Sequence, residues 1–403
     1  YVNNDRWYGV LWDKLADKKK LTTFFVPTLA RSKFKDIFSL YKEANLSTRN
    51  YIFKESFLQF KDLIFVFGHK KRIKKIKFNN VMVQEYDFSD LIKYELNNNS
   101  DINATFESLF TYRFIKRFKQ AGFKVRLSID WFEGQCLDKA WNMGFKKYYP
   151  LVKTIGYRPY ESFPLYLCTF PILIEQEAQI IPDVIALQGK GTEISVKEFM
   201  PNLETILIPS FKSSYVWDFK RNHSSQGISS VTLALPISEK HSKLLIERII
   251  RSASLALIKN EAIKFLIKPH PAQSINKIMT GLGELPSYIS FTEEKSFVKL
   301  LFSTHLLITE ASSVCLEAMA CGIPVIMMEN QEGLTYDSIP RRVSKNMYRK
   351  VRSDDQLTEA MIYFIYANDK ISKQLEIDSK KIREDYFEPV TQEGINRLMD
   401  ISI

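Results

Sequence analysis

Apolar runs alternate with amphipathic stretches along the C-terminal half of the chain. Unbroken apolar runs of this length are typical of strands covered on both faces of a sheet. They occupy 230–236, 262–269, 288–291, 305–309 and 323–328. Apolar residues at three-to-four spacing predict helices at 238–258, near 294–302 and at 313–321. This alternation predicts parallel strands joined by right-handed crossovers, in a doubly wound α/β sheet.

The N-terminal half repeats the pattern less regularly. Its strand candidates are 22–27, 62–68, 80–86, 124–130, 182–189 and 204–210. Periodicity is lost and Ser and Gly accumulate over 210–228, which predicts a linker between two domains. A chain of 403 residues is also too long for one ordinary core.

We therefore expect two Rossmann-like domains that face a central cleft. The predicted boundaries are 1–212 for the N-terminal domain, 213–228 for the linker and 229–365 for the C-terminal domain. Two or three helices are predicted over 355–400. The segment 366–403 would form the C-terminal helices, which could pack back on the N-terminal domain.

Two polar clusters follow predicted strands of the C-terminal domain, at the edge where doubly wound sheets bind ligands. "LIKPHP" (266–271) brings Lys268, His270 and Pro271, and "TEASS" (309–313) brings Glu310, Ser312 and Ser313. A helix that begins at the serine pair would offer unpaired N–H groups beside two hydroxyls, an arrangement that holds phosphate.

His270 lies between two prolines, so its imidazole could be aimed at a phosphate oxygen or a leaving group. Glu317, one turn into the predicted helix, could accept hydrogen bonds from a ribose or sugar hydroxyl. Simple capping by Ser312 and a structural role for His270 are the alternatives.

The N-terminal domain offers "SIDWFEGQ" (128–135), in which carboxylates follow a strand beside aromatic residues. Glu133 is the first candidate for a catalytic base and Asp130 the second, with Trp131 as a sugar-stacking surface. Helix capping by one carboxylate and solvation of the other is the alternative. Lys190 in "QGKG" is a weaker candidate for binding donor phosphate or acceptor, because this motif lacks the spacing of a phosphate-binding loop. Arg158 in "GYRPY" could bind an anionic acceptor, and a turn-stabilising role is the alternative.

Basic residues exceed acidic ones by a net charge of +11, and part of this surplus is clustered. Six basic residues occupy 70–77, and "RFIKRFK" (113–119) adds four more. A basic surface favours an anionic partner, either an acidic membrane or an acidic polymer. Nucleic acid is disfavoured because no groove-reading module is recognisable. The longest apolar run, 163–174, is broken by prolines and is too short to cross a bilayer.

"KPHP" followed by "SSVCLEAMACGIPVI" resembles, in order, spacing and placement, the C-terminal domain of GT-B-fold glycosyltransferases. The nearest likeness is to bacterial surface-polysaccharide enzymes with an HP motif and a serine-pair motif. This group includes sialyltransferases, Kdo transferases and the glycerophosphotransferases of teichoic acid synthesis. The resemblance spans roughly residues 125–345.

This resemblance implies a nucleotide-sugar donor as substrate, with no cofactor and no metal. By this resemblance, His270 and the Ser312–Ser313 pair would bind the donor phosphate, with Glu317 near the ribose. The residue patterns add Lys268, Pro271, Glu310 and Lys190 as donor-binding candidates, and Trp131 and Arg158 as acceptor-binding candidates. Glu133, Asp130 and His270 are the candidates for catalysis.

Cytidine donors (CMP- or CDP-linked) are favoured over UDP. The acceptor would be a capsule, lipopolysaccharide or O-antigen polysaccharide, or a glycolipid, handled in the cytoplasm at the inner face of a bacterial plasma membrane. The sequence leaves open whether the transfer inverts or retains configuration. A sugar-nucleotide epimerase of the same fold and a glycerophosphotransferase are the alternatives.

Overall fold

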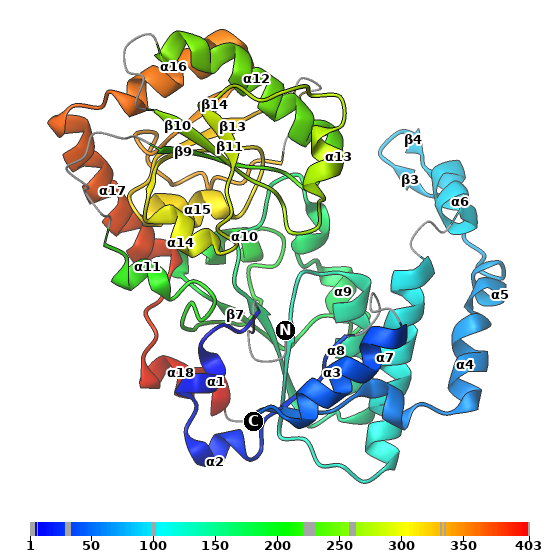
Figure 1. Cartoon of the computed structure of the whole chain (residues 1–403). Coiled ribbons are helices and arrows are strands. Elements are labelled where there is room, and N and C mark those ends of the chain that lie inside the picture. The colour runs from blue at the N-terminus through cyan, green and yellow to red at the C-terminus, as the bar shows by residue number, and fades with distance from the viewer. Residues whose placement is uncertain are drawn as a thin grey trace.

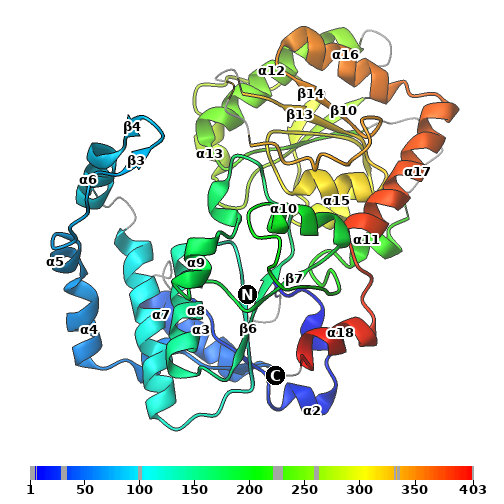
Figure 2. The same ribbon diagram turned by 180° about the vertical axis from the view of Figure 1, so that it is seen from behind.

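The computed structural model describes residues 5, 7–28, 34–98, 102–220, 230–257, 263–330, 333 and 336–401. Two α/β lobes lie one above the other, each around its own parallel sheet (Figure 1). The reverse view shows the same two lobes connected along one side by the C-terminal helices (Figure 2).

The C-terminal lobe contains a six-stranded parallel sheet. Its strands are β9 (Ser230–Ala234), β10 (Lys264–Lys268), β11 (Ile289–Phe291), β12 (Thr304–Thr309), β13 (Val325–Met328) and β14 (Tyr348–Val351). Their spatial order is β11-β10-β9-β12-β13-β14, and every pair is parallel. This order is that of the dinucleotide-binding fold. Successive strands are added on one side of β9 up to β11, and from β12 onward they are added on its other side. The carboxyl ends of these two strands are therefore the expected ligand position.

Helices cover both faces of this sheet. The lobe contains α12 (Glu239–Leu257), α13 (Ile275–Met279), α14 (Phe297–Leu301), α15 (Val314–Ala320), α16 (Asp354–Ile365) and α17 (Asp369–Tyr386). One apolar core joins the sheet to α12 and α16, and a second joins it to α15 and α17. Because the strands are buried on both sides, their sequences run apolar without alternation.

The N-terminal lobe contains a four-stranded parallel sheet in sequential order. Its strands are β5 (Leu127–Trp131), β6 (Lys153–Arg158), β7 (Val184–Leu187) and β8 (Thr205–Leu207). The helical elements after β5 are α8 (Cys136–Tyr148), η2 (Leu167–Thr169), α9 (Leu173–Glu177), η3 (Lys190–Thr192), α10 (Glu193–Lys197) and α11 (Tyr215–Asp218).

The segment before β5 is mainly helical. It comprises α1 (Leu11–Lys14), α2 (Asp17–Lys20), β1 (Phe24–Phe25), α3 (Phe34–Asn45), β2 (Asn50–Tyr51), η1 (Lys54–Phe57), α4 (Phe60–Phe67), α5 (His69–Ile73), β3 (Met82–Val83), β4 (Tyr86–Asp87), α6 (Ser89–Asn98) and α7 (Ile102–Gln120). Helix α7 packs against α8, with Phe114, Ile115 and Phe118 buried in the core between them. The second basic run is therefore anchored by its apolar face.

The C-terminal helices connect the two lobes. Helix α17 packs on α15 and on η3, while α18 (Gln392–Met399) packs on β8 and α1. Gly189 and Gly191 allow this approach: a Cβ on Gly189 would lie 2.4 Å from the backbone carbon of Tyr386. The "QGKG" sequence thus has a packing role. The predicted linker contains α11, and its residues 221–228 lie outside the described part of the chain.

The predicted strands of the C-terminal half are confirmed, as are those at 124–130, 182–189 and 204–210. The strand predicted at 62–68 is wrong, because this run forms α4. An apolar run of this length does not distinguish a strand from a helix. The Gln59–Asp62 capping pair and the packing of α4 against α7 favour the helix.

The runs at 22–27 and 80–86 form only two-residue strands outside the main sheets. Strands β6 and β14 were not predicted. The reason is that β6 contains Lys, Thr, Gly and Arg, and β14 contains three polar or basic positions in four.

Candidate active site

An open cleft with about 310 Å³ of empty space lies between the lobes. The N-terminal lobe contributes loops after β6 and β7, and the C-terminal lobe contributes the start of α15. The lining residues are Pro159, Tyr160, Glu161, Phe163, Gln188, Ser313, Leu316, Glu317, Ser338 and Phe387. Two predicted site residues, Ser313 and Glu317, are among them.

The predicted serine pair lies at the turn between β12 and α15. Ser313 is the N-cap residue of α15 and is exposed. Ser312 Oγ accepts a 3.5 Å hydrogen bond from Val314 N. Glu317 is held from the other side, because Tyr215 Oη donates to its Oε2 at 2.5 Å and Lys212 Nζ lies 3.7 Å from its Oε1. Lys212 thus brings a cation from the crossover segment to the cleft.

The other predicted cluster lies at the end of β10. Since β9 separates β10 from β12, the loop carrying His270 and Pro271 and the serine loop leave strands that are not direct neighbours. Lys268 Nζ donates to the carbonyl oxygens of Glu294 and Lys295, each at 2.9 Å. His270 Nδ1 accepts a 3.2 Å hydrogen bond from Ala272 N. Lys268 therefore stabilises a neighbouring loop, and the convergence of His270 with Ser312 stays a prediction.

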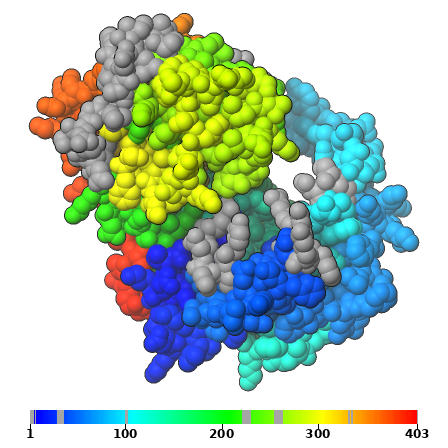
Figure 3. Space-filling model, viewed as in Figure 1, coloured from blue at the N-terminus to red at the C-terminus, as the bar shows by residue number. Residues whose placement is uncertain are grey.

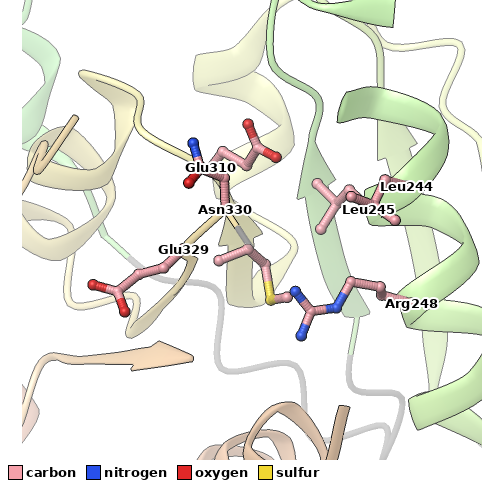
Figure 4. Close-up of a pocket in the computed structure, with 7 residues that line it drawn as sticks. Leu244, Leu245, Arg248, Glu310, Glu329 and Asn330 are labelled. Atoms are coloured by element: carbon pink, nitrogen blue, oxygen red, sulfur yellow. The ribbon is translucent and has the colours of Figure 1, made fainter. Parts of the chain in front are cut away.

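Glu310 borders a second hollow, with about 240 Å³ of empty space, between α12 and the ends of β12 and β13. Figure 4 shows Leu244, Leu245 and Arg248 on one side of it, and Glu310, Glu329 and Asn330 on the other. His241 Nδ1 lies 3.1 Å from Glu310 Oε2. His241 follows β9 at the point where the strand order reverses, and sequence reasoning missed it because no motif surrounds it.

The loop after β5 holds the predicted catalytic carboxylates. Glu133 accepts hydrogen bonds from Trp131 Nε1 (2.8 Å) and Gln135 Nε2 (2.7 Å), so it is tied into its own loop. Asp130 Oδ2 accepts from Asn142 Nδ2 at 3.1 Å. Burial, and then the neighbouring Asp138, raise the pKa of Asp130.

The N-terminal segment lies over this loop. Trp7 packs edge-on against Trp131, with 4.4 Å between the ring centroids. Tyr8 stacks on Tyr157. Burial raises the pKa of Asp138 to about 6, and the nearby Glu133 adds to the rise. Tyr160 also stacks on Trp131, with 6.4 Å between the ring centroids, and the sugar-stacking role of Trp131 stays a prediction.

The two weaker candidates also have structural partners. Lys190 Nζ forms a 3.2 Å ion pair with Asp385 at the end of α17. Arg158 is fully buried, and its Nη1 donates to the carbonyl oxygen of Thr169 at 2.6 Å. Within the described residues, Arg158 Nε and Nη2 are enclosed and have no hydrogen-bond partner.

Glu161 is a second residue that the sequence did not reveal. It follows β6, lines the interlobe cleft, and its enclosed Oε2 has no partner among the described residues. Burial raises the pKa of Glu161 to about 7, and nearby Arg158 and the Ser195 hydroxyl oppose that rise only in part. A carboxylate with this pKa is suited to accept a proton near neutral pH. The unpredicted strand β6 positions it, which is why it was not found.

No group of three or more His, Cys, Asp or Glu side chains in the described ranges is arranged to hold a metal ion. None of the helices in that same part of the chain is long and apolar enough to cross a bilayer. Metal independence remains a prediction.

The chain matches no protein-family model. No curated protein matches it either. Solved structures share its fold at low identity. UDP-GlcNAc 2-epimerase from Neisseria meningitidis, bound to UDP-GlcNAc, has a TM-score of 0.52 and 12% identity over 94% of this chain and 97% of that one.

MnaA of S. aureus, solved with UDP, has a TM-score of 0.51 and 10% identity over 93% and 94% of the two chains. The calicheamicin glycosyltransferase CalG4 has a TM-score of 0.51 and 8% identity over 94% and 89%. The predicted GT-B fold with two Rossmann-like domains is confirmed. The sialyl, Kdo and teichoic-acid subfamilies receive no support from these likenesses.

Proposed function

We propose that the protein is a glycosyltransferase that moves a sugar from a nucleotide donor to an acceptor hydroxyl in the interlobe cleft. The observation that supports it is the composition of this cleft. One wall carries Ser313 and Glu317, which lie at the start of α15 in the lobe whose sheet has the dinucleotide-binding strand order. The opposite wall carries Glu161. Two substrates held on opposite lobes would meet there, as sugar transfer requires.

The lining residues suggest how the chain would assist an inverting transfer. The acceptor hydroxyl proton passes to the Glu161 carboxylate while the acceptor oxygen forms a bond to the sugar C1. The bond between C1 and the phosphate oxygen breaks, and its electron pair leaves with the nucleotide. We propose that the Ser313 hydroxyl in the cleft wall, helped by the neighbouring Ser312 and by Lys212 beside Glu317, stabilises the phosphate charge. Glu161 thereby replaces Glu133 and Asp130 as our first candidate for the base.

The donor nucleotide can be identified with a thermal-shift panel of CMP, CDP, UDP and GDP. The resemblance to surface-polysaccharide enzymes favours a cytidine nucleotide, and we expect at least one of the four to raise the melting temperature. Failure of all four to bind would refute the proposed function.

Calorimetry on two variants locates the donor site. Removal of one hydrogen bond to a phosphate by Ser313→Ala should raise the Kd about 10-fold. Ser290→Ala, on the edge strand β11, is the matched control. His270→Ala should raise the Kd similarly if His270 contacts the donor, and an unchanged affinity would remove His270 from this site.

A second candidate, a sugar-nucleotide epimerase, is favoured by the fold shared with the Neisseria meningitidis enzyme. Product analysis separates the two reactions. A transferase releases free nucleotide and a glycosylated acceptor only when an acceptor is present. An epimerase converts the nucleotide sugar alone, and a glycerophosphotransferase would use CDP-glycerol instead. The acceptor that we propose to supply first is a lipid-linked or polysaccharide fragment from a bacterial surface glycan.

A further inference from the structure

Residues 60–98 form a segment that projects beside the body of the molecule and that we call the basic arm. It contains α4, α5, the β3–β4 hairpin and α6 (Figure 1). In the space-filling view, an open gap separates the arm from the C-terminal lobe over part of its length (Figure 3).

The arm is anchored by one face of α4. Val66 is fully buried, and buried Asp62 pairs with Arg113 and Arg117 of α7. These contacts hold the arm against the long α7–α8 pair. The opposite face of α4 is consequently fixed in an outward orientation.

The charge of the arm is concentrated just after α4. Six basic side chains occupy 70–77 without an intervening acid, and all six are exposed. They are Lys70, Lys71, Arg72, Lys74, Lys75 and Lys77. Such a cluster attracts an anionic surface at short range.

Large apolar side chains lie next to this charge. Phe60 is 76% exposed, Ile64 61% and Phe67 58%, all on the short helix α4. Ile76 follows among the lysines, and Met82, Val83, Tyr86, Leu91 and Tyr94 continue along the hairpin and α6. Large exposed apolar side chains beside a cluster of charge are typical of an interaction site.

We propose that the basic arm docks the protein on an acidic phospholipid surface. The charge complements anionic headgroups, while Phe60 and Ile64, one turn apart on the same helix face, would enter the acyl boundary. Nucleic acid fits less well, because Leu63, Ile64 and Ile76 are aliphatic and gain nothing from phosphates or stacked bases. This inference goes beyond the proposed function, since it requires neither a donor nor catalysis.

Vesicle sedimentation with the whole chain tests this docking. Phosphatidylcholine vesicles containing about one third phosphatidylglycerol are compared with pure phosphatidylcholine vesicles, without nucleotide. We expect binding to the acidic vesicles alone, weakened as NaCl rises from 0.1 to 0.5 M because salt screens the charges.

Two variants separate charge from insertion. Lys70→Gln/Lys71→Gln/Lys74→Gln should lower the partition coefficient roughly 100-fold, at about 0.7 decade per lysine. Phe60→Ser/Ile64→Ser should lower it about 10-fold with no change in charge.

Matched controls remove the same groups from other surfaces. Lys370→Gln/Lys373→Gln/Lys381→Gln removes three exposed charges from α17. Leu151→Ser removes an apolar side chain that is 82% exposed. Both should bind vesicles like the wild type, and circular dichroism melting checks that every variant is folded.

Three results would overturn the proposal. The first is equal loss of binding in the α17 and arm lysine variants, which would indicate net charge alone. The second is tighter binding to a 20-base-pair duplex than to acidic vesicles, lost in the arm variants. The third is a dimer in light scattering that Phe60→Ser/Ile64→Ser dissociates, with no vesicle binding by the wild type.

Discussion

Replacement of Glu161 by Gln distinguishes a catalytic carboxyl from one that is merely buried, because the substitution should change stability and activity in opposite directions. The Gln side chain keeps the size of Glu161 and carries no charge. It therefore removes the cost of ionising an enclosed group that lacks a partner at Oε2. It also removes the proton acceptor that we propose for the reaction.

The effect on stability follows from the pKa. The folded protein holds the Glu161 proton with a pKa of about 7, against 4.5 for an ordinary glutamate. The unfolded chain therefore ionises first as the pH rises, and the folded state loses stability between pH 4.5 and about 7. The full difference corresponds to about 3 kcal/mol. Glu161→Gln should match the wild type near pH 4 and exceed it by about that amount at pH 8.

The assays are urea denaturation across pH 4 to 8 and steady-state kinetics with the donor found in the nucleotide panel. The wild-type kcat/KM should rise with pH through an apparent pKa near 7. In Glu161→Gln it should fall by a factor of 100 or more at pH 8. Glu198→Gln, which removes an exposed carboxyl from the same lobe, is the control for the loss of one negative charge.

The two measurements can fail separately. A stability difference that does not grow with pH would mean that Glu161 is not held in its protonated form by burial. A more stable variant with full activity would mean that the carboxyl is buried as described but is not the base. In that case the Asp130–Asp138 pair, whose pKa values burial also raises, would become the next candidate.

Two further predictions concern the packing that supports the site. Asp62→Ala leaves the guanidinium groups of Arg113 and Arg117 without their carboxylate, and should lower the free energy of unfolding by about 3 kcal/mol in urea denaturation. Gly189→Ala places a Cβ 2.4 Å from the backbone of Tyr386, and should cost about 2 kcal/mol in the same assay by forcing the end of α17 away from the N-terminal lobe. An unchanged denaturation midpoint in either variant would contradict the contact that it tests.

The sequence predicts the C-terminal lobe well, for a physical reason. Each of its central strands is covered on both faces, so burial requires an unbroken apolar run. The turn at Ser312 and Ser313 and the following Gly322 and Pro324 delimit α15 clearly. The same pattern could not reveal the strand order, which comes from non-local pairing and places β9 between the two predicted ligand loops.

The N-terminal lobe shows where such reasoning fails. The run that forms α4 carries apolar side chains on the face that packs on α7 and also on the exposed face, and it is too short for its pattern to distinguish a helix from a strand. Strand β6 has the opposite problem, because Thr154, Gly156 and Arg158 interrupt its apolar residues although all three are buried. Missing β6 meant missing Glu161, whose environment depends on tertiary contacts alone.

The distribution of unsatisfied polar groups supports the same location for the chemistry. Within the described part of the chain, the enclosed side-chain atoms without a hydrogen-bond partner belong to the N-terminal lobe, on or beside the ends of β5, β6 and β7 or on α8: Asp130, Asn142, Tyr157, Arg158, Glu161, Ser162 and Gln188. Each such atom costs about 1–3 kcal/mol. Native structures rarely accept this cost in a core whose only role is packing, whereas a binding site can recover it from the polar groups of a ligand. Since two of these residues, Glu161 and Gln188, face Ser313 across the cleft, an acceptor rich in hydroxyl groups would offset the cost and bring its nucleophile to the base.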